Sequence, residues 1–116
     1  MTKIDEYVPG RVVVEGVEHN RDVIVLPNRV VGDWWRRSGH SLVIEDLTDV
    51  LDELPERVIV GCGYASRLKP DPSVIDALER RGVEVEALPT DEAVARYGEI
   101  ERENPAAVAA ALHLTC

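Results

Sequence analysis

The sequence predicts an α/β fold of three layers, in which helices lie on the faces of a mixed central sheet and a β-hairpin forms the N-terminal part. Two patterns carry this prediction. β-branched runs separated by turn residues fill the first third of the chain, which is typical of a hairpin. The second half alternates short apolar runs with helically spaced apolar residues, and this indicates strands covered by helices. Because the 116 residues contain no repeat or linker, residues 1–116 are expected to form a single domain.

The predicted hairpin lies near the N-terminus. Its strands are 11–15 and 22–26, both rich in valine and isoleucine, and the residues 16–20 between them favour turns. Pro27-Asn28 is expected to close the hairpin. Shorter segments are then expected at 30–31 (a strand), 32–39 (a loop or one helical turn) and 41–44 (a strand).

Start and stop signals delimit the next two helices. Asp46 has the position of an N-cap before the helically spaced apolar residues of 47–54. Asp71 caps a second helix with Pro72 at its first position, where the ring's fixed φ suits a helix. Gly82 is suited to ending that helix, because glycine adopts the left-handed conformation common after a helix C-terminus.

Two more helices are expected towards the C-terminus. Thr90 caps the first, and the acidic residues that follow it suit the positive end of a helix dipole. Asn104 and Pro105 repeat the cap-plus-proline signal for a last helix over 106–112. Residues 113–116 are expected to form a tail that either adds an edge strand or frays.

Two strands alternate with these helices and locate a first candidate site. Residues 57–60 and 83–88 are β-branched runs, and the helix between them predicts a right-handed parallel crossover. The run at 57–60 leads into a glycine-rich turn, and α/β folds usually bind ligands in loops at the carboxyl ends of strands. The residues predicted to line a ligand pocket there are Gly61, Cys62, Gly63, Tyr64, Arg67 and Lys69.

This turn matches known types of site incompletely. It departs from the dinucleotide fingerprint Gly-x-Gly-x-x-Gly at Ser66, and the next helix begins only near Pro72. Cys62 would act as a nucleophile only with a base in reach, and His40 and His113 are the candidates. The two cysteines also lack the close spacing of a structural zinc site. We therefore predict no catalytic residue, no metal and no cofactor, and interpret the turn first as a sharp change of backbone direction.

A second candidate site is an interaction patch of aromatic and basic side chains. One of the adjacent tryptophans is expected to pack inward and the other to remain exposed. Aromatic residues with arginine are typical of recognition surfaces, although the same group can equally cap the core with its arginines paired to nearby acids. The residues of this predicted patch are Trp34, Trp35, Arg36, Arg37 and His40.

Composition limits the classes of partner. Twenty-two acidic and 13 basic side chains give a net charge of −9, which disfavours nucleic acid and anionic membranes. No apolar run approaches the roughly 20 residues of a membrane-spanning helix, and the first residues lack a secretory signal pattern. We therefore expect a cytoplasmic protein with free thiols. Its acidic, lysine-poor composition suits either a high-salt cytoplasm or a GC-rich genome.

The order of several motifs resembles a known family of small proteins. The motifs are Asp22-Val-Ile-Val-Leu-Pro, Trp35-Arg-Arg, Gly39-His40, Asp46-Leu, Ile59-Val-Gly-Cys-Gly, Gly82-Val-Glu-Val-Glu, Thr90 with Ala93 and Tyr97, and Ala109-Ala-Ala-Leu-His-Leu-Thr-Cys. Together they resemble the family of the adipogenesis-associated "Mth" domain protein and the mitochondrial NADH–ubiquinone oxidoreductase assembly factor three. The resemblance spans nearly the whole chain and implies a three-layer α/β fold without established catalytic residues. It also implies an assembly role like that of the mitochondrial members.

These observations favour a non-enzymatic protein-binding or assembly module. The partner is expected to be another protein or a second copy of the chain. The alternative is a small-molecule-binding protein or a thiol enzyme with its site at the Gly61-Cys62-Gly63 turn.

Overall fold

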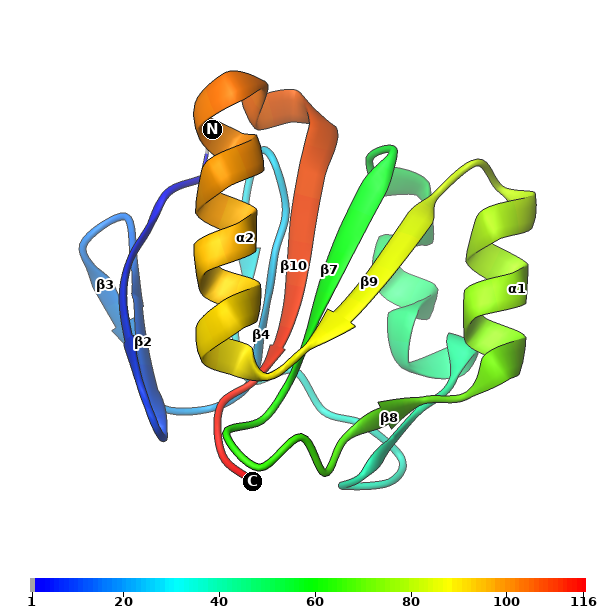
Figure 1. The fold of residues 1–116 in the computed structure, drawn as a ribbon, viewed down its shortest axis with the longest axis horizontal. Coiled ribbons are helices and arrows are strands. Elements are labelled where there is room, and N and C mark those ends of the chain that lie inside the picture. Colours follow the sequence, from blue (N-terminus) through cyan, green and yellow to red (C-terminus); the bar gives the residue numbers. More distant parts are fainter. Residues whose placement is uncertain (1) are drawn as a thin grey trace.

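The computed structural model describes residues 2–116 and centres on a five-stranded mixed sheet (Figure 1). Its strands are β4 (Val23–Val25), β5 (Val30–Val31), β7 (Arg57–Cys62), β9 (Glu84–Leu88) and β10 (Val108–His113). Their order across the sheet is β5-β4-β10-β7-β9. β10, β7 and β9 are parallel, whereas β4 is antiparallel to both of its neighbours. The predicted parallel pairing of 57–60 with 83–88 is therefore confirmed.

Two smaller sheets flank the central one. An antiparallel sheet of β1 (Ile4–Val8), β2 (Arg11–Val14) and β3 (Val17–His19) lies beside α2 (Thr90–Glu103) at the left of Figure 1. A short parallel pair joins β6 (Ser41–Leu42) to β8 (Lys69–Pro70). This pair connects the segment before the 3-10 helix η1 (Ile44–Glu53) to the segment before α1 (Pro72–Arg80).

Apolar side chains pack on both faces of the central sheet. Val58 and Val60 of β7 face η1 and α1, whereas Ile59 points to the other face and packs with α2 and β2. The two hydrophobic clusters give three layers, so the predicted three-layer α/β fold with a mixed sheet is confirmed.

The boundaries of α1 follow the signals in the sequence. Asp71 accepts a hydrogen bond from the Ser73 N–H, and Pro72 is the first helical residue. After the helix, Gly82 has a φ of +83°, a conformation that glycine adopts without strain. The predicted cap, first turn and stop of this helix are all confirmed.

The predicted last helix over 106–112 is wrong. Val108–His113 is β10, the middle strand of the central sheet, and all of its residues are buried. Only η2 (Pro105–Ala107) keeps a helical turn, capped by Asn104. Alanine favours helices, but pairing with strands on both sides and covering layers on both faces outweigh that local preference.

The predicted pairing of 11–15 with 22–26 is also wrong. β2 pairs with β1 and β3, whereas β4 belongs to the central sheet and pairs with β10 and β5. Pro27-Asn28 does form a turn, in which the Leu26 N–H donates to the Arg29 carbonyl, but this turn joins β4 to β5. Valine-rich runs indicate strands without specifying their partners.

Two predicted caps have other roles. The helix expected after Asp46 is 3-10 and begins at Ile44, so the Asp46 carboxylate lies inside its first turn and accepts from the Val43 N–H. Thr90 is the first residue of α2, not its cap. Its hydroxyl joins the ends of β7 and β10, because it accepts from the Gly63 N–H (2.7 Å) and donates to the His113 carbonyl (2.6 Å).

Candidate functional site

The turn after β7 is filled by the chain's own C-terminal tail, residues 114–116. The Tyr64 N–H donates to the Thr115 carbonyl (2.8 Å), and the Arg67 N–H donates to the Cys116 carbonyl (3.0 Å). Figure 1 shows the tail running beside this turn at the lower edge of the molecule. Backbone N–H groups that would bind an anion in a phosphate-binding loop therefore already have partners.

Gly63 shows how closely the tail and the turn pack. Its φ is +96°, and a Cβ at this position would lie 2.5 Å from the Thr115 carbonyl oxygen and collide with the Cys116 backbone. Only glycine fits both the conformation and the space. The geometry leaves no room for a ligand at Gly63.

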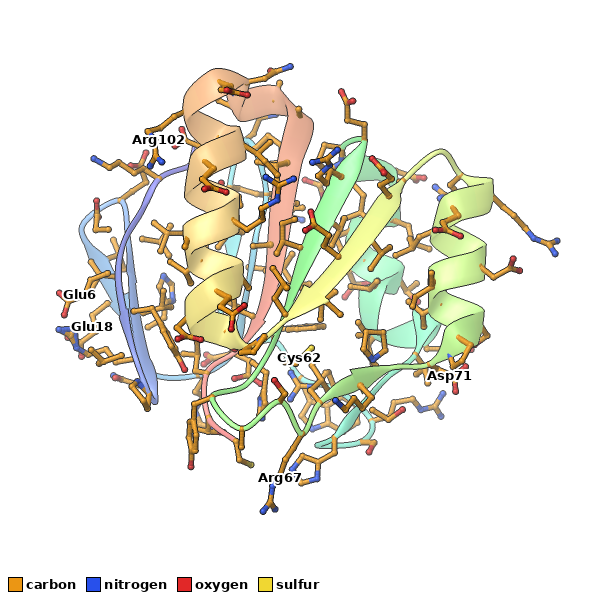
Figure 2. The ribbon with its side chains drawn as sticks, viewed as in Figure 1. Glu6, Glu18, Cys62, Arg67, Asp71 and Arg102 are labelled. Atoms are coloured by element: carbon orange, nitrogen blue, oxygen red, sulfur yellow. The ribbon has the colours of Figure 1, made fainter. Side chains whose placement is uncertain are left out.

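The other residues of the predicted pocket differ in burial. Gly61 and Cys62 are buried, whereas the side chains of Tyr64, Arg67 and Lys69 are exposed. Figure 2 shows Cys62 in the interior and Arg67 projecting away from the molecule. Burial raises the pKa of the Cys62 thiol, and the positive charge of Lys69 offsets only part of this effect. A thiol in this environment is a poor nucleophile.

The two histidines considered as bases have other partners. His40 Nε2 lies 3.4 Å from Sγ of Cys116, and His113 is hydrogen-bonded through Nδ1 to Asp22. Within residues 2–116 the Cys62 thiol has only a weak contact with the Val60 carbonyl, at 3.9 Å. The structure therefore does not bring a base to Cys62.

The loop after β5 carries the tryptophan pair and is fixed on both sides. Trp34 is 8% exposed, and its Nε1–H donates to the Asp46 carbonyl (2.9 Å), while its backbone N–H donates to the Asp22 carbonyl (2.8 Å). The Arg37 N–H donates to the Asp46 carboxylate (3.0 Å). The next aromatic residue, Trp35, is 76% exposed. The prediction of one inward and one outward tryptophan is therefore confirmed.

A buried ion cluster supports this loop from behind. The Arg36 guanidinium lies 2.6 Å from Asp22 Oδ2 and 4.9 Å from the centre of the Trp34 ring, and its side chain is only 6% exposed. His113 Nδ1 lies 2.8 Å from the same Asp22 oxygen, and the Leu114 N–H donates to the other one (2.8 Å). Arg36 is therefore a support of the predicted interaction patch and not part of its surface.

The protonation of Asp22 follows from these contacts. Burial by itself would raise the pKa of Asp22, but hydrogen bonds from His113, Leu114 and Arg36 together outweigh it, and the pKa is lowered. Asp22 is thus a carboxylate at neutral pH. The Arg36 Nε and His113 Nε2 atoms are buried and have no hydrogen-bond partner within residues 2–116.

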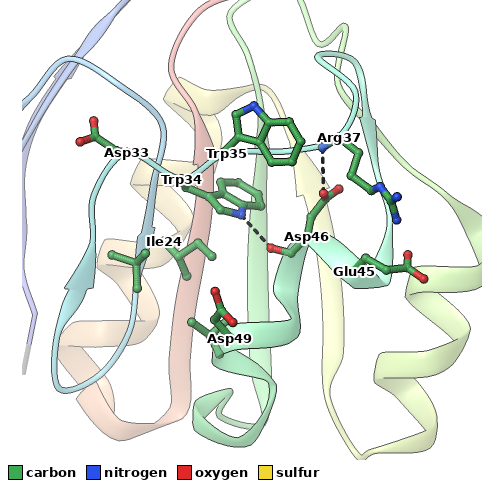
Figure 3. A pocket seen from close by; sticks show the side chains of 10 residues that line it. Ile24, Asp33, Trp34, Trp35, Arg37, Glu45, Asp46 and Asp49 are labelled. Carbon is green, nitrogen blue, oxygen red and sulfur yellow. Dashed lines mark hydrogen bonds between the residues drawn. The ribbon is translucent and has the colours of Figure 1, made fainter.

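A cavity of 540 Å³ opens beside the tryptophan loop, and we call it the Trp35 groove (Figure 3). Its buried apolar residues are Ile24 and Val50, and Trp34 and Trp35 form part of its wall. The groove combines an apolar interior with an exposed aromatic ring at its edge. Such a combination is typical of a binding site for an anchoring side chain.

The polar lining of the groove is mainly acidic. The carboxylates are those of Asp33, Glu45, Asp46 and Asp49, and among residues 2–116 Arg37 is the only basic residue that lines the cavity. Figure 3 shows these side chains arranged around the two tryptophan rings, with Asp46 holding both Trp34 and Arg37. The groove therefore carries a net negative charge.

The interaction patch predicted from the sequence contains the two tryptophans and Arg37, but not the acidic and apolar residues that line the rest of the groove. The acidic residues at 45, 46 and 49 recur with helical spacing soon after the tryptophans, and that signal could have identified one wall of the groove. The pairing of Asp22 with His113, in contrast, leaves no local signal because 91 residues separate them. His40 lies apart from the groove, beside Cys116.

Neither a metal-binding cluster nor a membrane-spanning helix is found within residues 2–116. No group of three or more His, Cys, Asp and Glu side chains in this range is arranged to hold a metal ion. No helix in the same range has the length and apolar character needed to cross a membrane.

A family model described as "Protein of unknown function (DUF498/DUF598)" matches residues 4–113. Several solved structures match nearly the whole chain. A conserved hypothetical protein from Pyrococcus horikoshii is 28% identical, with a TM-score of 0.76 over 98% of this chain and 99% of that one. The structure named MT938 is also 28% identical, with a TM-score of 0.78 over all of both chains.

A Bordetella pertussis protein described as a Mth938-like domain has the same fold. It is 20% identical, with a TM-score of 0.73 over 97% of this chain and 85% of that one. The resemblance to the Mth domain family is therefore confirmed. The names of these proteins describe a hypothetical protein or a domain type, and assign neither an enzymatic nor a binding role.

Proposed function

The chain belongs to the DUF498/DUF598 family, whose function is unknown, and we propose that it is a non-enzymatic protein-binding module whose partner docks in the Trp35 groove. One observation supports this most directly. Trp35 is 76% exposed at the edge of a cavity, although the loop that carries it is fixed by hydrogen bonds through its neighbours Trp34 and Arg37. The assembly role implied by the family resemblance is consistent with such a module.

The energetics of association favour this arrangement. Tryptophan is enriched among the residues that contribute most to protein interfaces, because it buries a large apolar surface with few rotatable bonds. A loop that is already held in place loses little conformational entropy when a partner binds. Trp35 therefore has the properties of an anchor residue in a preformed site.

A small-molecule or thiol site at the Gly61-Cys62-Gly63 turn has less support. The tail occupies the space beside Gly63, and the buried Cys62 thiol has a raised pKa. The Trp35 groove lies elsewhere, beside the tryptophan loop.

Affinity capture with a matched aromatic control tests the proposal. The purified protein, Trp35→Ala and Tyr64→Ala are immobilised and exposed to a lysate of the organism that encodes the chain. Tyr64 is the control because it is 57% exposed on the turn after β7 and does not line the groove. Any protein retained by the wild type and Tyr64→Ala but not by Trp35→Ala is identified, purified and titrated by calorimetry.

We expect the identified partner to bind the wild type directly and to lose about tenfold or more in affinity with Trp35→Ala. Sedimentation of the protein alone tests the homodimer as the other partner. Equal retention by all three proteins, together with a monomeric wild type, would contradict the proposal. Equal unfolding midpoints in urea establish beforehand that both variants are folded.

A further inference from the structure

We infer that the segment bound in the Trp35 groove is cationic and places an arginine side chain against the Trp35 ring. This inference rests on the proposed function and specifies the chemistry of the partner. Its basis is the charge of the groove, where four carboxylates and one arginine line a cavity that also exposes an indole ring.

Two of these carboxylates are available to a partner. Glu45 and Asp49 are exposed, and within residues 2–116 no hydrogen bond or ion pair engages either carboxylate. Asp33 has only a long contact of 3.8 Å with Arg21, and both side chains are more than four-fifths exposed. Such an exposed pair is weak and exchanges readily for a better one. Asp46 differs, because backbone N–H groups already occupy its carboxylate.

The same loop already contains the contact that we propose for the partner. Arg36 lies over the ring of Trp34, with its guanidinium carbon 4.9 Å from the ring centre, and its charge is balanced by Asp22. Trp35 presents a second indole ring beside Glu45 and Asp49, and within residues 2–116 no guanidinium lies over this ring. A partner arginine would complete a second set of the same kind, an indole with a guanidinium and a carboxylate.

Arginine suits this site better than lysine does. Its planar guanidinium stacks on aromatic rings, is weakly hydrated and binds carboxylates with two parallel hydrogen bonds. The net charge of −9 would also accelerate the approach of a cationic protein. It opposes pairing of two acidic grooves, so a second copy of the chain docked groove to groove is disfavoured.

Peptide titrations followed by NMR test the inference. The probes are short Gly/Ser peptides of equal length in which the same positions carry arginine, lysine, glutamine or glutamate. They are added to ¹⁵N-labelled protein at low salt and again at high salt. The Nε1–H signal of Trp35 reports on the groove, whereas that of Trp34, which is bonded to the Asp46 carbonyl, serves as an internal reference.

We expect the arginine peptide to bind most tightly and to shift the Trp35 signal, and we expect salt to weaken it. Glu45→Gln with Asp49→Asn should weaken binding about three- to tenfold. The control Glu92→Gln with Glu103→Gln changes the net charge equally on α2, on the other face of the sheet, and should have little effect. Arg37→Gln should tighten binding, because it removes a positive charge from the lining of the groove.

Several outcomes would overturn the inference. The first is that the glutamine or glutamate peptide binds as tightly as the arginine peptide, and the second is that the Trp35 signal does not shift. The third is that the groove variant and the α2 variant weaken binding equally, which would indicate non-specific attraction to an acidic surface. The proposed function fails independently, when Trp35→Ala retains every captured protein. Loss of a partner with Trp35→Ala but no preference for arginine would reject this inference alone.

Discussion

The turn after β7 and the loop after β5 leave the central sheet at the same edge, yet one is closed and the other is open. Both strands run in the same direction, because β5 is antiparallel to β4, which is itself antiparallel to β10 and hence to β7. The turn after β7 begins with Gly63 and is filled by the tail after β10. The loop after β5 carries two tryptophans and borders the Trp35 groove.

A glycine turn at the edge of a sheet where ligands usually bind therefore does not guarantee a ligand site. Glycines leave space, and here the backbone of Thr115 and Cys116 takes that space and the hydrogen-bonding groups around it. In the tryptophan loop the ring of Trp34 is buried, and the ring of the adjacent Trp35 is therefore directed to solvent. Four predictions test this comparison, and those with the largest expected effect on stability come first.

Gly63→Ala should disrupt the packing of the tail against the turn after β7. Among these substitutions it should lower the free energy of unfolding the most. The Cβ would collide with the tail, and alanine is strained at a φ of +96°, so we expect a loss of about 3 kcal/mol or more in the free energy of unfolding. The measurement is urea denaturation followed by fluorescence.

Gly10→Ala is the matched control for this change. Gly10 also has a positive φ, +83°, but no atom lies within 4 Å of the position of its Cβ. Strain alone should cost about 1 kcal/mol there. Equal losses for the two variants would show that packing of the tail against Gly63 contributes nothing.

Asp22→Asn should weaken the buried ion cluster that holds the tryptophan loop after β5. The substitution leaves Arg36 buried without its carboxylate, so we expect a loss of about 1–3 kcal/mol at neutral pH. Glu84→Gln removes a pair with Arg57 in which Glu84 is largely exposed, and it should cost less than about 1 kcal/mol. Similar losses for both variants would contradict a structural role for the buried cluster.

The effect of Asp22 should also depend on pH. The pKa of Asp22 is lower in the folded state than its usual value, so its contribution is complete above about pH 3.9 and is lost as the pH falls through the folded-state pKa. The difference in unfolding free energy between wild type and Asp22→Asn should therefore shrink on the acid side of pH 3.9. A difference that stayed constant into that range would refute this origin.

Thiol labelling tests whether the turn after β7 is closed, and this test does not depend on a difference in stability. Cys116→Ser leaves Cys62 as the only thiol, and Cys62→Ala leaves Cys116. In folded protein at mildly alkaline pH, we expect iodoacetamide to modify Cys62 at least about a hundredfold more slowly than in urea, because modification requires local opening. Cys116, which is partly exposed beside His40, should react at a rate close to its rate in urea. Rapid modification of Cys62 in folded protein would favour the alternative function, a thiol site at the Gly61-Cys62-Gly63 turn.

Local signals predicted several elements because the responsible interactions are close in sequence. Asp71, Pro72 and Gly82 specify the ends of α1 through contacts within a few residues. The divergent directions of Trp34 and Trp35 follow from their being adjacent. The prediction of a helix over 106–112 was wrong because this segment forms β10, whose pairing partners are distant in sequence, at 23–25 and 57–62.

The class of fold, the family, the acidic character and the tryptophan pair could be predicted from the sequence, because composition, periodicity and motif order are present in the chain. Which candidate site is open depends on the tertiary structure. The tail closes the glycine turn, the Asp22–Arg36–His113 cluster fixes the tryptophan loop, and η1 supplies the acids of the groove. Each of these depends on contacts between distant segments, which packing of the sheet and its layers brings together.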